Sequence, residues 1–359
     1  MARVAVVLFN LGGPDKPQSV QPFLFNLFND GAIIDQPAII RWCLAQLISR
    51  RRAPIAREIY HHLGGKSPLL ELTTKQAEAL QQELSDLDEV EVFVCMRYWH
   101  PMSDEVARSV QAYDPDHIVL LPLYPQYSTT TTGSSFTDWR RAAAKIGLRR
   151  RTHAVCCYPI DDGWISAQSQ LLGDTLTSLD PEMPLRVLFS AHGLPKKVIA
   201  RGDPYQWQVE QTAQAVAAAL DIRDDPNNGT AKKQIDWVVC YQSRVGPLEW
   251  IGPSVLDELS RAAIEQVGVV IVPIAFVSEH SETLVELDIE YREEAERLGV
   301  LNYTRVPAVG TAPKFINGLA GLVRHALGQS ENLSCGEGDG ARICPAQHGE
   351  CPLSIVVSP

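Results

Sequence analysis

Short apolar segments alternate with amphipathic segments along the whole chain of 359 residues. The apolar segments are rich in valine, isoleucine and leucine, as expected of parallel strands that are buried on both faces. The segments between them repeat apolar positions every three to four residues, which predicts helices. This alternation predicts an α/β protein with parallel sheets. The predicted strands are 3–9, 91–96, 117–123, 152–157, 185–190, 236–241, 268–274 and 303–307, and the clearest helices are 71–86 (with Thr73 or Thr74 as candidate caps), 206–220 and 312–328.

Two pairs of segments resemble each other across the chain. Strand 3–9 followed by Asn-Leu-Gly-Gly-Pro resembles strand 185–190 followed by Ala-His-Gly-Leu-Pro, and segment 119–128 resembles segment 270–278. This repeat, together with the chain length, predicts two similar doubly wound, Rossmann-like halves with a ligand cleft between them. The expected organisation is an N-terminal half over 1–155, a C-terminal half over 156–310, a helix over 311–330 and a tail over 331–359.

Residues 23–52 form an unusually apolar segment that ends in Arg50-Arg51-Arg52. One interpretation is a pair of amphipathic helices packed on the core. The other is an apolar lip that contacts a hydrophobic substrate or a membrane surface, with the arginines binding anionic groups.

Charge and hydropathy exclude several classes of protein. The net charge of −11 argues against nucleic acid as the main partner, because phosphate binding needs concentrated lysine and arginine. No apolar run is long enough for a membrane-spanning helix. The N-terminus leads directly into a strand pattern without a targeting segment, so we expect a cytoplasmic, bacterial protein.

The predicted strand 185–190 is followed at once by His192. In open parallel sheets, ligands bind beyond the carboxyl ends of the strands. A histidine after a strand is often a structural residue, but the small neighbours Ser190, Ala191 and Gly193 leave room for a ligand. Neutral imidazole is both a proton acceptor and a metal ligand, so we favour a functional role.

A group of carboxylates follows the predicted strand 268–274. Glu279 and Glu282 come soon after it, and Glu282, Glu286 and Glu290 are spaced to lie on one helix face, close to His280. Such a row is compatible with a solvated surface. It is also compatible with a path for protons or divalent cations, because histidine and glutamate together accommodate ferrous iron.

Arginine, aromatic and hydroxyl side chains follow other predicted strands, at Arg97–Pro101 and Tyr124–Ser135. Neither nucleotide-binding glycine motif is present, which argues against a nucleotide cofactor. This mixture suits a flat ligand that carries carboxylates.

Eight motifs occur in order over residues 3 to 328 and together resemble one family, the ferrochelatases, which insert ferrous iron into protoporphyrin IX in the last step of haem synthesis. The motifs are Phe9-Asn-Leu-Gly-Gly-Pro, Gly64-Gly-Lys-Ser-Pro, Arg97-Tyr-Trp-His-Pro, Tyr124-Pro-Gln-Tyr-Ser, Leu188-Phe-Ser-Ala-His-Gly-Leu-Pro, Gly202-Asp-Pro-Tyr, Tyr241-Gln-Ser-Arg-Val-Gly-Pro and Pro273-Ile-Ala-Phe-Val-Ser-Glu-His-Ser-Glu-Thr-Leu.

The resemblance implies a chelatase fold and a role for each candidate residue. His192 corresponds to the histidine that takes pyrrole protons or handles Fe²⁺, and Glu282 to a carboxylate on the opposite side of the macrocycle, with His280 beside it. Glu286 and Glu290 would lead iron outward. Leu11 stands where some relatives carry methionine. The porphyrin-binding positions implied are Leu11, Arg52, Tyr60, Ser67, Arg97, Tyr98, Tyr127 and Trp250, with Arg52 and Ser67 at the propionates.

Three cysteines, Cys335, Cys344 and Cys351, lie in the polar tail. A [2Fe–2S] cluster, a zinc site or free thiols are all compatible with them, and His348, Cys156 or Cys157 are candidate fourth ligands. The resemblance favours a [2Fe–2S] cluster with Cys157 (or Cys156), in a structural or sensory role. Because alternate strand residues face opposite ways, we expect only one of that pair to reach the tail.

The resulting interpretation is a ferrochelatase that binds protoporphyrin IX and Fe²⁺. The alternatives are a chelatase for coproporphyrin or another tetrapyrrole, and a non-catalytic porphyrin or haem carrier. Relatives that carry the cluster are often homodimers, although no interface can be recognised in this sequence. A peripheral membrane contact follows from the lip interpretation of residues 23–52 and not from the resemblance.

Overall fold

The computed structural model describes residues 2–222, 235–243 and 248–353. Residues 244–247, which end the motif that begins at Tyr241, lie outside the described residues, as do the last six of the tail. The chain forms two compact units: unit 1 comprises Met1–Tyr158, Leu319–Ile343 and the chain from Cys351, and unit 2 comprises Pro159–Gly318 and Cys344–Glu350. The expected tail domain is therefore shared between the two units.

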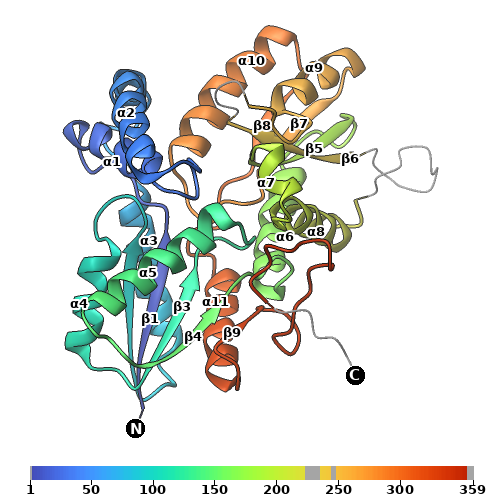
Figure 1. Cartoon of the computed structure of the whole chain (residues 1–359). Helices are drawn as coiled ribbons and strands as arrows, with labels where there is room; N and C mark the ends of the chain where they lie inside the picture. Colours follow the sequence, from blue (N-terminus) through green and yellow to red (C-terminus); the bar gives the residue numbers. More distant parts are fainter. Residues whose placement is uncertain (1, 223–234, 244–247, 354–359) are drawn as a thin grey trace. The chain divides into compact units, whose positions relative to one another are not determined.

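Unit 1 is built on a five-stranded parallel sheet with the order β2-β1-β3-β4-β9 (Figure 1). Its strands are β1 (Arg3–Asn10), β2 (Glu89–Met96), β3 (His117–Pro122), β4 (Arg151–Val155) and β9 (Leu333–Ser334). Its helices are η1 (Pro17–Ser19), α1 (Val20–Phe28), α2 (Ala38–His61), α3 (Leu69–Glu83), α4 (Ser103–Tyr113), η2 (Thr129–Gly133) and α5 (Ser134–Lys145).

Unit 2 is built on a four-stranded parallel sheet with the order β6-β5-β7-β8. Its strands are β5 (Leu185–His192), β6 (Ile235–Gln242), β7 (Gly268–Pro273) and β8 (Tyr303–Arg305). Its helices are α6 (Asp162–Thr177), α7 (Lys196–Ala200), α8 (Tyr205–Ala219), α9 (Val255–Glu265), η3 (Glu282–Glu290) and α10 (Tyr291–Leu298), and the unit boundary falls within α11 (Pro313–Gly328).

The two sheets share one winding order, which confirms the predicted pair of similar halves. In each sheet the first strand pairs with the second on one side and with the third on the other, and the fourth follows the third. This order reverses direction between the first and third strands, β1 and β3 in unit 1 and β5 and β7 in unit 2. The segments that resemble each other in sequence start at these four strands.

The apolar runs form strands because both faces of each sheet are covered. All six residues of β7 are buried, and so is every residue of β5 except His192. Parallel strands in this position need near-continuous apolar sequence. His192 is therefore the point at which β5 leaves the core.

Three elements differ from the sequence expectations. Helix α3 begins at Leu69, so Thr73 is not a cap but a buried residue whose hydroxyl accepts a hydrogen bond from Asn10 at 2.9 Å. Helix α2 does not end at the three arginines but continues through Pro54 to His61. Strand β9 was not predicted, because two residues carry no periodicity.

Residues 23–52 are helical at both ends, in α1 and α2. Phe23 and Leu24 of α1 are buried in a small apolar core, whereas Ile39 and Trp42 of α2 are 82% and 51% exposed. The packing interpretation therefore holds for α1, whereas the lip interpretation stays a prediction for the exposed side chains of α2. No helix in the described part of the chain combines the length and apolarity that crossing a bilayer requires.

Candidate active site

The site in unit 2 forms where its sheet reverses direction. His192 ends β5, and Glu282 begins η3, which follows the neighbouring strand β7. His192 Nδ1 lies 2.9 Å from Glu282 Oε2, and the two side chains are 39% and 24% exposed. The sequence interpretation placed them on opposite sides of a ligand, whereas the structure places them in direct contact.

Each member of this pair changes the protonation of the other. Burial by itself would lower the pKa of His192, but the charge and hydrogen bond of Glu282 outweigh it and raise that pKa above its usual value. Burial would likewise raise the pKa of Glu282, but His192 and then His280 lower it. The pair therefore favours an ionised carboxylate beside an imidazole that binds a proton near neutral pH.

His280 lies deeper than His192. It is buried, its ring centroid lies 4.7 Å from that of Phe276, and burial lowers its pKa. Its backbone N–H donates to Thr283 Oγ1 at 2.9 Å, but its Nδ1 has no hydrogen-bond partner among the residues that the structure describes. A buried neutral imidazole with an unpaired nitrogen is suited to receive a ligand or a water molecule.

Glu286, one turn further along η3, is held by a set of donors. Its Oε1 accepts from the Ser243 N–H and the Tyr291 hydroxyl, both at 2.9 Å. Its Oε2 accepts from Gln242 Nε2 at 3.1 Å and from the Ser243 hydroxyl. A carboxylate offers about four acceptor positions, so these donors occupy them all. Burial and the nearby charge of Glu282 raise the pKa of Glu286.

The remaining two carboxylates do not join the pair. Glu279 was expected in the same cluster, but it binds Arg305 Nη1 at 2.9 Å and accepts from the Ala308 N–H at 2.9 Å. Glu290 is exposed at the end of η3. Because η3 is a π-helix, whose hydrogen bonds run from i to i+5, side chains four residues apart no longer follow the row expected for an α-helix.

In unit 1, several predicted porphyrin-binding residues converge. Leu11, Tyr60 and Tyr98 pack in one apolar cluster with α1, and Tyr98 is fully buried. Ser67 lies against Gly13, where an added Cβ would approach its hydroxyl to 2.5 Å. Arg97 joins the cluster through Tyr98, since its guanidinium stacks over that ring at 4.8 Å.

The other three predicted porphyrin-binding residues lie elsewhere. Tyr127 is buried beside Cys156, Cys157 and Cys335, not with the apolar cluster of α1. Arg52 is exposed on α2. Trp250, in unit 2, approaches Gly193, next to His192, and its buried Nε1 lacks a hydrogen-bond partner among the described residues.

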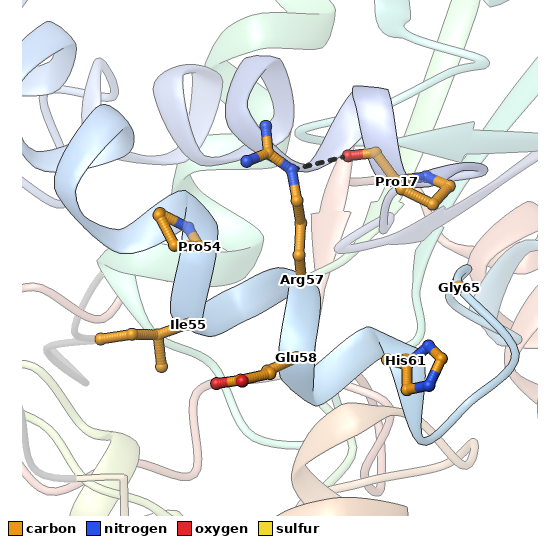
Figure 2. Close-up of a pocket in the computed structure, with 7 residues that line it drawn as sticks. All are labelled: Pro17, Pro54, Ile55, Arg57, Glu58, His61 and Gly65. Atoms are coloured by element: carbon orange, nitrogen blue, oxygen red, sulfur yellow. Dashed lines mark hydrogen bonds between the residues drawn. The ribbon is translucent and has the colours of Figure 1, made fainter.

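A pocket of about 410 Å³ opens on unit 1 beside α2 (Figure 2). The side chain of Arg57 lines the pocket, and its Nε donates a hydrogen bond to the Pro17 carbonyl at 3.2 Å. The side chains that line it include Arg57, Glu58 and His61, and none of the predicted porphyrin-binding residues is among them. This pocket therefore does not coincide with the predicted site residues.

Thiols gather at the edge of the unit 1 sheet. The Sγ atom of Cys157 lies 3.5 Å from that of Cys156 and 3.6 Å from that of Cys335, and Cys351 is also buried. Hydrogen bonds from Cys156 and then Cys157 lower the pKa of Cys335 to about 4. Cys344 belongs to unit 2, where Gln208 Nε2 donates to its Sγ at 3.1 Å.

Both members of the cysteine pair reach the tail, contrary to the strand-alternation expectation. Strand β4 ends at Val155, so the alternation of side chains does not extend to Cys156 and Cys157. Across the described residues, no group of three or more His, Cys, Asp or Glu side chains is arranged to hold a metal ion.

Sequence reasoning gave no role to several residues that shape these sites. Gln242 and Ser243 hold Glu286, and Asp30 binds Arg97 and Tyr98. Gln242 ends strand β6, so the rule that placed His192 at a strand end also applies to it. Asp30 has no such signal.

Comparisons with known proteins bear on the family and the fold of the chain. The ferrochelatase family model matches residues 3–327. A curated ferrochelatase from Caulobacter vibrioides is 53% identical over 97% of this chain and 98% of the relative. One from Pelagibacter ubique is 47% identical over 97% of this chain and 98% of the relative. The solved structure of SirB from Bacillus subtilis with Fe3+ has a TM-score of 0.51 and 14% identity over 91% of this chain and 97% of that one, which supports the fold.

Proposed function

Since the chain belongs to the ferrochelatase family and is a haem-forming metal chelatase, we propose that His192 and Glu282 act together as its proton-accepting pair. The observation that carries this proposal is the 2.9 Å contact between the two side chains. Metallation releases two protons, because Fe²⁺ replaces the two pyrrole N–H hydrogens of the porphyrin. A base is therefore needed next to the ring.

The geometry supports one assignment of the imidazole nitrogens. Neutral His192 donates its Nδ1–H to the Glu282 carboxylate, which leaves the lone pair of Nε2 to accept one pyrrole proton. The imidazole, which is 39% exposed, then passes this proton to solvent and can accept the second. The resulting imidazolium is stabilised by the carboxylate that it faces. Because the two groups touch, they act on the macrocycle from the same side, and His280 provides a second imidazole behind them.

We assign Glu286 a different task from the one that the sequence suggested. Its four donors leave no acceptor position for iron, so it fixes η3 to the end of β6 and keeps a carboxylate close to the pair. An iron path through Glu286 would first have to break these hydrogen bonds. Glu290, at the exposed end of η3, is the better candidate for a first contact with the metal.

We further propose that tail cysteines hold a [2Fe–2S] cluster. The proximity of the thiols supports this, because cluster ligands are cysteine thiolates and the Sγ atoms of Cys157 and Cys335 lie 3.6 Å apart. The pKa of Cys335 is lowered, whereas that of Cys157 is raised by its neighbouring thiols and by burial. Cys157, Cys335, Cys344 and Cys351 would be the ligands, with Cys156 as the alternative to Cys157. When bound, the cluster supplies a covalent connection among these residues, and it takes no part in the proton transfer.

The exposed apolar side chains of α2 support a peripheral membrane contact. Ile39, Trp42 and Leu47 are each more than half exposed, and Arg50–Arg52 follow them. Apolar side chains followed by arginines suit the interface of an anionic bilayer. In a sedimentation assay with anionic vesicles, the wild-type protein should pellet with the vesicles, whereas a Trp42→Ser variant should stay in the supernatant. A homodimer and a cytoplasmic location stay predictions.

The proton-accepting pair is tested by anaerobic metallation of protoporphyrin IX with Fe²⁺, followed in the haem absorption bands. We expect His192→Ala to lower kcat by about 10² to 10⁴-fold, the contribution of a general base, with porphyrin binding unchanged by fluorescence titration. His100→Ala is the matched control, because His100 also contacts a glutamate, Glu105, at 2.8 Å, but on the surface. Undiminished turnover in His192→Ala would overturn the proposal.

The same assay separates the substrate alternatives. Coproporphyrin offered in place of protoporphyrin IX distinguishes the two macrocycles by kcat/KM. The visible spectrum of the freshly purified protein, recorded before substrate is added, reports the cluster by its sulfur-to-iron charge-transfer bands. Their loss in Cys157→Ser, but not in Cys156→Ser, would identify the ligand of the pair.

A further inference from the structure

A single carboxylate, Asp30, collects hydrogen bonds from three separate parts of unit 1. Its Oδ2 accepts from Arg97 Nη2 at 2.9 Å, from the Tyr98 hydroxyl at 2.7 Å and from the Ser134 hydroxyl. Its Oδ1 accepts from the Ala32 N–H at 2.9 Å. The side chain is only 8% exposed. Asp30 therefore joins the chain after α1 to the residues that follow β2 and to the start of α5.

The partners of Asp30 are also bound to one another. Arg97 Nε donates to Ser134 Oγ at 2.7 Å, and Asn26 of α1 donates to the Tyr98 carbonyl at 3.0 Å. Arg97 and Asp30 form an ion pair in which only 16% and 8% of the two side chains are exposed. A hydrogen-bonded ion pair of this kind is shielded from water and holds its members in one arrangement.

This network changes the roles open to Arg97 and Tyr98. The Tyr98 hydroxyl and two guanidinium nitrogens of Arg97 are already hydrogen-bonded inside unit 1. A porphyrin carboxylate would have to displace Asp30 to bind the Tyr98 hydroxyl or Arg97 Nη2, and Arg97 Nη1 already lies 3.8 Å from Asp138 Oδ2. The apolar cluster beside the network, in contrast, contains Leu11 and Tyr60, which present carbon surface suited to a flat macrocycle.

We propose that Asp30 is a positioning residue for the porphyrin, acting through Arg97 and Tyr98 to fix α1 and its apolar cluster at the carboxyl end of the unit 1 sheet. The inference rests on the proposed function, since it presumes that the macrocycle binds there. Loss of the carboxylate should free the segment after α1. The apolar surface would then be ordered only when porphyrin binds, and that ordering costs affinity.

The test compares Asp30→Asn with wild type in steady-state metallation, varying porphyrin and Fe²⁺ separately. Asparagine keeps the size and one acceptor oxygen but loses the charge that pairs with Arg97. We expect the KM for porphyrin to rise about tenfold, as the loss of a charge-assisted hydrogen bond predicts. The kcat and the KM for Fe²⁺ should stay within about twofold. Asp104→Asn, which removes a surface carboxylate paired with Arg141 and Lys145, is the matched control.

Two further measurements distinguish a loss of porphyrin positioning from a loss of folding. Thermal unfolding confirms that each variant is folded, and Asp30→Glu should recover part of the porphyrin affinity because it restores the charge. An unchanged porphyrin KM in folded Asp30→Asn, or a fall in kcat alone, would overturn the inference. If wild type binds porphyrin but does not metallate it, the proposed function fails, and fluorescence titration of porphyrin with the same variants still decides the role of Asp30.

Discussion

Asp30 in unit 1 and Glu282 in unit 2 are both largely buried carboxylates, yet their partners differ in kind. Asp30 is bound by a permanently charged guanidinium and by hydroxyl groups, and it is almost closed to solvent. Glu282 is bound by an imidazole that titrates near neutral pH and is 39% exposed. A second carboxylate, Glu286, lies near Glu282, and the charge of Glu282 raises the pKa of Glu286.

This difference shows how one kind of side chain serves two purposes. A carboxylate with fixed partners stabilises an arrangement of the chain, because neither partner changes its charge. A carboxylate with a titratable partner and access to a ligand stores and releases a proton. The distinction lies in the partner and not in the depth of burial.

The strongest test of this distinction is turnover. Glu282→Gln should lower kcat by about 10² to 10³-fold, because the imidazolium formed on proton transfer loses its stabilising charge. Asp30→Asn should leave kcat nearly unchanged. Stopped-flow metallation at saturating porphyrin measures both, and equal losses in the two variants would contradict the distinction.

The free energy of unfolding should respond in the opposite way to turnover, with a larger loss for the Asp30 variant than for the Glu282 variant. Asp30→Ala leaves the Arg97 guanidinium with only the more distant carboxylate of Asp138, at 3.8 Å, and we expect the free energy of unfolding to fall by about 3 to 5 kcal/mol. Glu282→Gln should change it by less than about 1 kcal/mol, because the loss of the contact with His192 is offset by relief of repulsion from Glu286. Urea unfolding monitored by tryptophan fluorescence compares the two. A larger loss in Glu282→Gln would reverse the assignment.

The pH profile gives a smaller but more specific difference. Turnover requires neutral His192, so the rate should fall as the pH decreases through its pKa, which Glu282 raises. Glu282→Gln removes that influence, and the acid limb of kcat/KM should move to lower pH. Asp30→Asn should not move it. An unshifted limb in Glu282→Gln would show that His192 is not the group that titrates.

The smallest expected effect is that of Tyr98→Phe. This variant removes one of the hydroxyl donors of Asp30 and leaves the Arg97 contact intact, so we expect a loss of about 1 kcal/mol in unfolding free energy. Porphyrin KM should rise by less than in Asp30→Asn. A loss as large as that of Asp30→Ala would mean that the hydroxyl, and not the ion pair, holds the network.

The sequence predicted the sheets more completely than the sites. All eight predicted strands formed, and the four central ones, β1, β3, β5 and β7, are almost wholly buried. Burial on both faces requires continuous apolar sequence, a local property that can be recognised without knowing which segments lie alongside. His192 and Glu282 were predicted because the ends of adjacent parallel strands meet at one edge. Their direct contact was not, since it depends on how η3 begins.

The partners of Asp30 and Glu279 could not be predicted from the sequence for a similar reason. Asp30 is one acid after an apolar helix, and its partners are separated from it by 67 to 104 residues. Glu279 lies among the predicted site carboxylates, but its partner Arg305 is 26 residues further on. A charge pattern in sequence gives the candidates, whereas only tertiary packing decides which candidates become paired.

The edge of the unit 1 sheet has a consequence for synthesis of the protein on the ribosome. Strand β4 is completed by β9, and Cys157 is separated from Cys335 by 178 residues. At ordinary elongation rates, this interval corresponds to about 10 to 35 s during which the edge of β4 has no partner. The N-terminal part of the chain therefore leaves the ribosome first, but its sheet is completed last. A nascent chain stalled before residue 333 would expose the outer edge of β4, which is paired only with β3, beside two reduced thiols. That stage of translation is where we expect a folding chaperone to be needed most.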